Sequence, residues 1–191
     1  MALRCFIAVT LPGPLKKAVG EVIRSLRESG ADIKWVHDEN LHLTLKFLGE
    51  TEEARLDEIK GALFKKLSHY SPFYIKIGGV GYFPGGRNPR VIWVGIEEPG
   101  SLADIYTDVE SVMVKFRYQR EDRPFSPHLT IGRVRSPKTA GEAIKRLEEF
   151  RTVAFDEFVV KAVTLMKSEL KPGGAEYSCL AEISLEGKND D

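Results

Sequence analysis

Two short segments of the sequence share nearly the same residues and the same alternation of side chains. Residues 41–45 read Leu-His-Leu-Thr-Leu, and residues 127–131 read Pro-His-Leu-Thr-Ile. Alternation of this kind predicts a β-strand, in which successive side chains point to opposite faces of a sheet. Each strand would therefore bury its aliphatic residues in a core and present one imidazole and one hydroxyl on its other face.

The rest of the chain is predicted to contain further strands and amphipathic helices. Apolar residues at helical spacing predict helices over residues 15–26, 52–67, 102–116 and 139–147. Apolar runs predict strands over residues 3–10, 32–37, 41–48, 73–77, 90–96, 127–134 and, with a turn at 171–174, through the tail 152–186. Because strands often follow strands directly, we expect antiparallel sheets in an α+β fold and not a doubly wound parallel sheet.

Local signals predict where several of these elements begin and end. Gly49 is expected to end the strand 41–48, and Thr51 is expected to cap the helix that follows. Thr139 and Glu142 form a capping-box pattern at the start of the last helix. Frequent Gly and Pro residues predict a loop over 78–89, and mixed charges predict another over 117–123.

The charge balance limits how the protein can use nucleic acid. The 191 residues include 28 Lys and Arg and 28 Asp and Glu, so the net charge is zero. Proteins that coat nucleic acid by displacing its counterions are usually strongly basic. If this chain handles nucleic acid, we expect contact with a short stretch or one end and not with a long duplex.

Composition also indicates the compartment. Hydrophobic residues make up 42% of the chain, yet no apolar run approaches the roughly 20 residues that span a bilayer. The start of the chain is interrupted by Arg4 and stopped by Pro12, so we interpret it as a strand and not a secretory signal. Two cysteines without metal-ligand spacing favour a reducing cytoplasm. Cys5 and Cys179 would be neighbours if the terminal strands pair.

The paired motifs suit phosphoryl chemistry that needs no metal or other cofactor. Histidine, whose ordinary pKa is near 6.5, can act as general base or general acid near neutral pH. Threonine hydroxyls can donate hydrogen bonds to phosphate oxygens as charge builds on them. If the two strands lie side by side, one groove would contain His42, Thr44, His128 and Thr130. The His-x-His and His-Glu-x-x-His spacings typical of zinc sites are absent from the sequence.

Other conspicuous residues have simpler explanations. His37 lacks a following threonine and is expected on the surface or in a loop, and His69 is expected at a helix C-terminus. Trp35 and Trp93 fit core positions, although one aromatic residue beside a cleft could stack on a base. Arg90 fits equally well as a surface charge at a strand end or as a cation in the cleft.

Longer stretches around both motifs extend the pattern over essentially the whole chain. They are Arg4-Cys-Phe-Ile-Ala-Val, Lys34-Trp-Val, Glu39-Asn-Leu-His-Leu-Thr-Leu-Lys-Phe-Leu-Gly-Glu, Arg90-Val-Ile-Trp-Val-Gly and Pro127-His-Leu-Thr-Ile-Gly-Arg. With these stretches the chain resembles the two-histidine (2H) phosphoesterase superfamily. Within it, the chain is most similar to the RNA 2',3'-cyclic phosphodiesterase branch, also called 2'-5' RNA ligase or LigT-like.

The resemblance implies an architecture. Residues 1–191 would form a single domain of two intertwined, pseudo-symmetric lobes. Each lobe would be an antiparallel β-sheet backed by helices, and one His-x-Thr strand from each lobe would line a central cleft. Lobes that share one cleft require no partner chain, so a monomer is expected.

The resemblance also implies a reaction and the residues that carry it out. An RNA 2',3'-cyclic phosphate end would be hydrolysed to a 2'-phosphate, with O3' as the leaving group. By position, His42 matches the proton donor and His128 the proton acceptor that activates water. Thr44 and Thr130 match hydroxyls that bind the phosphate. Joining of RNA ends through a 2'-5' bond would use an RNA hydroxyl in place of water.

One further match concerns Arg133, which corresponds to an arginine that contacts the phosphate. Simple alternation along the strand would turn Arg133 to the face opposite His128. Gly132, between them, could permit a bulge that returns Arg133 to the same face.

Two other functions would use the same residues. A protein of this fold could hold a nucleotide or an RNA end without useful turnover. A related 2H enzyme could act on another cyclic phosphate, such as an ADP-ribose derivative or a small cyclic nucleotide. Hydrolysis, or its absence, on a short RNA with a cyclic phosphate end separates these possibilities.

Overall fold

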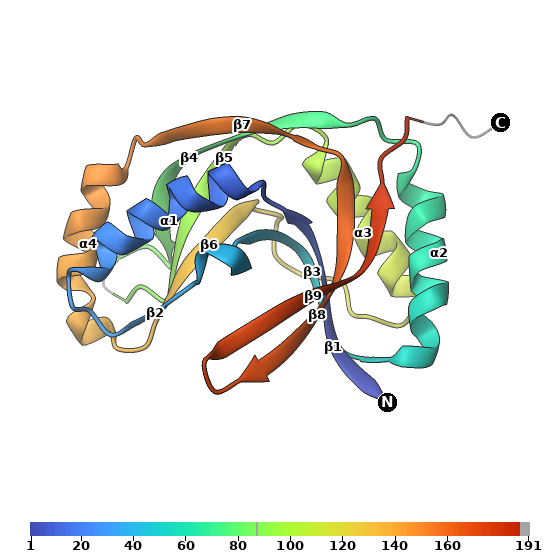
Figure 1. Cartoon of the computed structure of the whole chain (residues 1–191), viewed down its shortest axis with the longest axis horizontal. Helices are drawn as coiled ribbons and strands as arrows, with labels where there is room; N and C mark the ends of the chain where they lie inside the picture. Colours follow the sequence, from blue (N-terminus) through green and yellow to red (C-terminus); the bar gives the residue numbers. More distant parts are fainter. Residues whose placement is uncertain (87, 188–191) are drawn as a thin grey trace.

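A computed structural model describes residues 1–86 and 88–187 (Figure 1). The described strands form one nine-stranded sheet in which the paired strands run antiparallel, and four α-helices accompany it. This architecture confirms the α+β class. Within the same residues, no helix combines the length and the apolar character needed to cross a bilayer.

The elements follow the predicted order, although several of their ends differ from the prediction. The strands are β1 (Ala2–Thr10), β2 (Ile33–Trp35), β3 (His42–Glu52), β4 (Phe73–Phe83), β5 (Val91–Glu98), β6 (His128–Val134), β7 (Ala154–Val160), β8 (Ala162–Lys171) and β9 (Gly174–Ser184). The helices are α1 (Gly13–Arg27), α2 (Leu56–Leu67), α3 (Leu102–Lys115) and α4 (Gly141–Leu147), and η1 (Asp38–Asn40) is a 3-10 turn. Residues 117–123 contain no helix or strand, as their mixed charges predicted.

The order of the strands brings the two motif strands to the centre of the sheet. The order is β7-β4-β5-β6-β3-β1-β8-β9, and β2 also pairs with β6. The motif strands β3 and β6 are neighbours, with Leu43 opposite Leu129. On the outer sides, β4 pairs with β7 and β1 pairs with β8, so strands from the two halves of the chain pair with each other.

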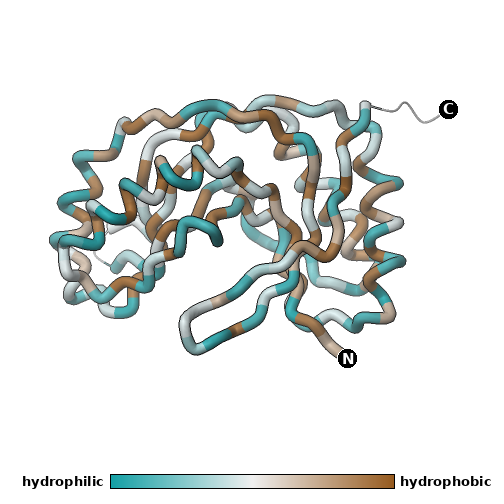
Figure 2. Tube along the Cα trace, viewed as in Figure 1, coloured by the Kyte–Doolittle hydropathy of each residue, from teal (hydrophilic) through white to brown (hydrophobic). Residues whose placement is uncertain are grey.

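Helices cover the two ends of the curled sheet. Figure 1 shows α1 and α4 together at one end and α2 and α3 together at the other. Each helix buries its apolar stripe, for example Ile59, Leu63 and Leu67 on α2. The β8–β9 hairpin projects away from the helices, and its tip is mostly hydrophilic or neutral in character (Figure 2).

The predicted end of the first motif strand is wrong. Gly49 does not end β3, which continues to Glu52. Its φ of +69°, a conformation open to glycine, coincides with a shift of register against β1, and the strand then continues. Thr51 is buried in this continuation and accepts a hydrogen bond from the Tyr118 hydroxyl, so it does not cap α2.

The predicted loop over residues 78–89 is also wrong in its first half. Residues 78–83 belong to β4 and pair with β5. Gly81 is in this strand because a Cβ there would collide with the Trp93 ring of the paired strand. Glycine here permits a close approach of two elements and does not mark a loop.

Two further local predictions are wrong. The hydroxyl of Thr139 accepts a hydrogen bond from the Asp32 backbone N–H and donates one to the Ser136 carbonyl, while α4 begins later without a side-chain cap. Cys5 and Cys179 are not neighbours through paired terminal strands, because β8 lies between β1 and β9. Cys5 is buried, Cys179 is exposed, and both are free thiols.

Candidate functional site

The two motifs present their polar side chains on the same side of adjacent strands. Leu43 and Leu129 are opposite each other and fully buried, while the histidine and threonine of each motif are half-buried on the other face. In an antiparallel pair with this register, His42 lies across from Thr130, and the threonine of the first motif lies across from His128. The predicted alternation is therefore confirmed.

Each histidine ring is oriented by a backbone carbonyl two residues earlier in the chain. Nδ1 of His42 lies 2.7 Å from the Asn40 carbonyl oxygen, and Nδ1 of His128 lies 2.7 Å from the Ser126 carbonyl oxygen. A carbonyl only accepts, so Nδ1 of each ring carries the hydrogen and donates it. The other nitrogen, Nε2, is then the one that can accept or release a proton at the reacting centre.

Aromatic rings surround both imidazoles. Phe6 and Tyr177 pack against His42 with centroid distances of 4.8 and 5.3 Å, and Phe83 packs against His128 at 5.4 Å. Burial lowers the pKa of His42 below its ordinary value near 6.5. The nearby positive charges of Lys16 and Arg133 lower it further, and the hydrogen bond to Asn40 opposes them. Burial and these cations together favour the neutral form of His42.

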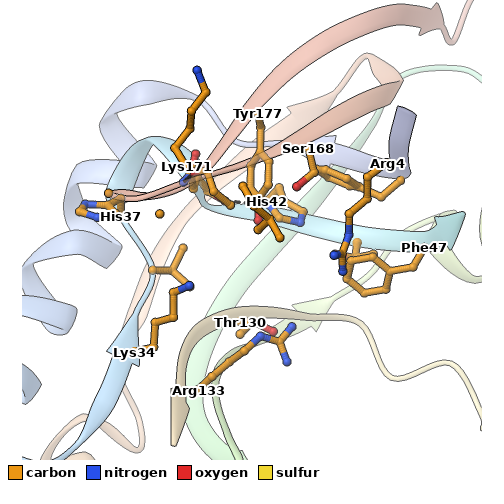
Figure 3. A pocket seen from close by; sticks show the side chains of 18 of the residues that line it. Arg4, Lys34, His37, His42, Phe47, Thr130, Arg133, Ser168, Lys171 and Tyr177 are labelled. Atoms are coloured by element: carbon orange, nitrogen blue, oxygen red, sulfur yellow. Dashed lines mark hydrogen bonds between the residues drawn. The ribbon is translucent and has the colours of Figure 1, made fainter. Parts of the chain in front are cut away.

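A bulge returns Arg133 to the face of the motif. Gly132 pairs with Ile92 and Thr130 pairs with Trp93, so the residue between them, Ile131, has no partner of its own. Arg133 consequently lies on the cavity side with Thr130, as Figure 3 shows. A similar register shift follows the first motif, between the pairs Ile7–Lys46 and Ala8–Thr44.

Gly132 itself serves the packing of the neighbouring strand. A Cβ at this position would lie 2.9 Å from side-chain atoms of Ile33 and of Trp35. Glycine here lets β2 pack tightly against β6, and the unpaired residue of the bulge is Ile131.

A cavity of about 730 Å³ opens above the motif strands. Of the site residues named from the sequence, His42, Thr44, Thr130 and Arg133 line it. His128 is not among its lining residues; it lies on the face of β6 that Thr130 shares, two residues away. Arg90 lies outside the cavity: its side chain is exposed, and its backbone bonds with Phe83 and Val134.

The cavity contains residues that the sequence did not single out. Arg4, Lys34, Arg135 and Lys171 supply positive charge, and Phe47 and Tyr177 supply aromatic surface. Figure 3 labels all of these except Arg135. Arg135 follows Arg133 by two residues, a strand spacing that could have revealed it. The others come from strands and a hairpin whose pairing the sequence does not disclose. Within the described residues, no group of three or more His, Cys, Asp or Glu could hold a metal ion.

Trp93, in contrast, belongs to the structure behind the site. Its ring packs against Phe83 with a centroid distance of 5.1 Å. Its indole nitrogen is buried and, within the described residues, has no hydrogen-bond partner. Trp93 therefore supports the ring that contacts His128 and is not itself on the cavity wall.

Comparison with known proteins finds curated relatives along nearly the whole chain. A protein of Methanothermobacter thermautotrophicus named RNA 2',3'-cyclic phosphodiesterase is 36% identical over 97% of this chain and 100% of its own length. A Thermotoga maritima protein of the same name is 33% identical over 97% of both chains.

Solved structures show the same fold. The crystal structure of TT0787 from Thermus thermophilus superposes with a TM-score of 0.82 at 32% identity, over 98% of this chain and 100% of the other. The Escherichia coli LigT structure with 3'-AMP superposes with a TM-score of 0.73 at 21% identity, over 97% and 99% of the two chains. The family described as the 2'-5' RNA ligase superfamily matches residues 14–172. The chain therefore belongs to the 2'-5' RNA ligase superfamily, the family that its paired histidine motifs resemble.

Proposed function

We propose that this protein hydrolyses 2',3'-cyclic phosphate ends of RNA to 2'-phosphates by acid–base catalysis with two histidines and without a metal. One observation carries the proposal. His42 and His128 lie on adjacent strands, and each ring is oriented by a hydrogen bond from Nδ1 to a backbone carbonyl, which leaves Nε2 available to the substrate. The curated relatives named RNA 2',3'-cyclic phosphodiesterase support this choice of substrate. All the side chains needed come from one chain, which is consistent with a monomer.

The geometry suggests how the two rings share the reaction. Nε2 of His128 accepts a proton from water as the water oxygen attacks phosphorus. The P–O3' bond breaks, and Nε2–H of His42 gives its proton to O3', which leaves a 2'-phosphate. Hydroxyls of Thr44 and Thr130 donate to the nonbridging oxygens, and Arg133 offsets their growing negative charge. An RNA hydroxyl in place of the water would give a 2'-5' linkage by the same proton transfers.

The acid role of His42 depends on the substrate. Burial and nearby cations lower its pKa, which disfavours the protonated form that a proton donor needs. A bound phosphate brings negative charge beside the ring and favours the protonated form. Substrate binding thus favours protonation of His42, and this proton is the one that the reaction then transfers to O3'.

The test is the fate of a short RNA ending in a 2',3'-cyclic phosphate, incubated with excess EDTA and followed by phosphorus NMR. We expect a 2'-phosphate. We expect His42→Ala and His128→Ala each to lower kcat by roughly 10²–10⁴-fold while the thermal midpoint is kept. His69→Ala, remote from the motifs in sequence and absent from the cavity lining, is the matched control and should retain activity.

Each other result changes the proposal in a defined way. A 3'-phosphate product would place the leaving group at O2' and reverse the assumed substrate orientation. Tight binding of a 2'-phosphorylated nucleotide without turnover would indicate a binding module. Hydrolysis of a small cyclic nucleotide, but not of the RNA end, would indicate a different cyclic substrate. Full activity in either histidine variant would refute two-histidine catalysis.

A further inference from the structure

The cavity is strongly cationic in a chain whose net charge is zero. Its lining includes Arg4, Lys34, Arg133, Arg135 and Lys171, and no Asp or Glu is among its lining residues. One terminal phosphate held by two histidines, two threonines and Arg133 does not need so many further charges. The excess indicates that the natural ligand carries more than one anionic group into the cavity.

Two of these cations oppose each other across a strand pair. Lys34 on β2 is the direct partner of Arg133 on β6. Like charges in directly opposite positions destabilise a sheet, and an acidic neighbour usually relieves them. Within the described residues neither side chain forms an ion pair, so this pair of cations is arranged for an anion that comes from outside the protein.

Arg135 continues the row of cations that Lys34 and Arg133 begin, in the direction away from the histidines. It lies two residues beyond Arg133, about 6.6 Å further along an extended chain. Its backbone N–H donates to the Asp32 carbonyl at 2.9 Å, which continues the pairing of β2 with β6 and holds this position in place. Like Lys34, Arg135 makes no ion pair within the part of the chain that the structure describes.

The three cations therefore divide into two positions. Arg133 is near enough to His42 to affect its protonation, and Figure 3 shows it beside Thr130 under the His42 ring. Lys34 projects from β2, at the left of the same view, and Arg135 lines the cavity just past the end of β6. A ligand that reaches both positions must carry two anionic groups joined by a spacer.

We propose that Lys34 and Arg135 form a second phosphate subsite, which binds the phosphodiester on the 5' side of the terminal nucleotide. The proposal rests on the proposed function, because it takes the cyclic phosphate to lie at the two histidines. It makes the substrate an oligonucleotide end, in preference to a free nucleoside cyclic phosphate.

The experiment isolates that one phosphate. Two substrates are compared: cytidine 2',3'-cyclic phosphate with a free 5'-hydroxyl, and the same compound with a 5'-phosphate methyl ester. For the unmodified protein, we expect kcat/KM to be about tenfold higher with the 5'-phosphate ester, the size of one charge-assisted contact. In the variant Lys34→Gln/Arg135→Gln, we expect the ratio of the two kcat/KM values to fall to about one.

A charge-matched control separates the subsite from the general field of the protein. Lys65→Gln/Lys115→Gln removes two exposed positive charges from α2 and α3, outside the cavity lining, and should keep the tenfold ratio. A ratio that survives in the Lys34/Arg135 variant, or is lost equally in the control, overturns the proposal. Equal loss of kcat/KM with both substrates also overturns it, since the two residues would then serve the terminal phosphate.

Failure of the proposed function remains distinguishable. If neither substrate is hydrolysed, the catalytic proposal fails, and calorimetry with the corresponding cytidine 2'-phosphates still tests the subsite. Tighter binding of the 5'-phosphorylated compound, abolished only in the Lys34/Arg135 variant, supports the second subsite without catalysis. Equal binding of the two compounds by the unmodified protein rejects it.

Discussion

At the scale of single residues, two identical motifs give two different imidazoles. Both rings donate Nδ1–H to a carbonyl two residues earlier, so their orientation is the same. Their surroundings differ because Phe6 and Tyr177 enclose His42 and because Arg133 approaches it from the other motif strand. The proposed division into acid and base therefore depends on residues outside the motifs.

The charge of Arg133 should be measurable through His42. Arg133→Gln removes a cation that disfavours the imidazolium, so the pKa of His42 should rise toward its ordinary value. NMR titration of the imidazole protons checks this, with Arg27→Gln, on the exposed side of α1, as the control. An unchanged pKa in Arg133→Gln would mean that Arg133 is not among the groups that lower it.

The same shift predicts how activity depends on pH. If His42 must hold a proton, kcat/KM falls as pH rises through the pKa of His42 in the free enzyme, which lies below 6.5. Bound phosphate raises that pKa, so the alkaline fall of kcat should occur at higher pH than that of kcat/KM. The pH profiles of kcat and of kcat/KM, measured with one substrate, test this prediction. Coincident alkaline limbs would argue against His42 as the proton donor.

A buried ion pair lies close behind the first motif. Lys46 donates to Glu110 on α3 at 2.7 Å and to the Gln119 carbonyl at 2.8 Å, and Glu110 also accepts from the Glu121 backbone N–H. Lys46→Met would leave a buried carboxylate without its partner and should cost about 3–5 kcal/mol of unfolding free energy. Lys46→Met/Glu110→Leu should recover much of this loss in urea denaturation. A double variant as unstable as the single one would contradict a charge-based cause.

At the scale of elements, local patterns predicted the type of each element better than its end. Alternation placed the motif strands correctly, and helical spacing placed the buried face of α2 correctly. Gly49 and Gly81 misled because glycine serves both loops and crowded or bulged strands, and only the partner strand distinguishes these uses.

Of the candidate site, the sequence likewise predicted the part that follows from local patterns and missed the part that depends on strand pairing. The histidines and threonines follow from period two along one strand, whereas the cavity position of Arg133 depends on a bulge defined by the pairing with β5. Lys34 enters the site through β2, a three-residue strand whose partner β6 is distant in sequence. Long-range pairing of this kind leaves no signal in a single sequence.

Two glycines provide a matched test of these backbone arguments. An added Cβ meets nothing within 4 Å at Gly49 or at Gly61, so each alanine variant reports conformation alone. Gly49→Ala, at φ +69°, should destabilise the protein by about 1–2 kcal/mol. Gly61→Ala, inside α2, should stabilise it by about 0.5–1 kcal/mol. Urea denaturation checks both, and shifts of the same sign would contradict the assignment of Gly49 to a left-handed conformation.

At the scale of the whole molecule, the charge is distributed unevenly. Five Lys and Arg residues line a cavity with no acidic residue among its lining residues, while the full chain has equal numbers of both signs. The remainder of the chain consequently carries more acidic than basic residues. RNA that extends beyond the cavity meets no general attraction, which favours the capture of ends over the coating of strands.

This distribution predicts how affinity depends on RNA length and salt. Among RNAs that end in a 2'-phosphate, the affinity should rise from one to about three nucleotides and then stay constant, because only the terminal phosphate and its nearest neighbours reach the cationic lining. Each neutralised phosphate contributes about −0.7 to the slope of log affinity against log salt for a single strand, so about three contacts give a slope near −2. Fluorescence anisotropy with RNAs of one to eight nucleotides at several salt concentrations measures both quantities. Affinity that continues to climb with length, or a slope well beyond −4, would mean that RNA follows a surface outside the cavity.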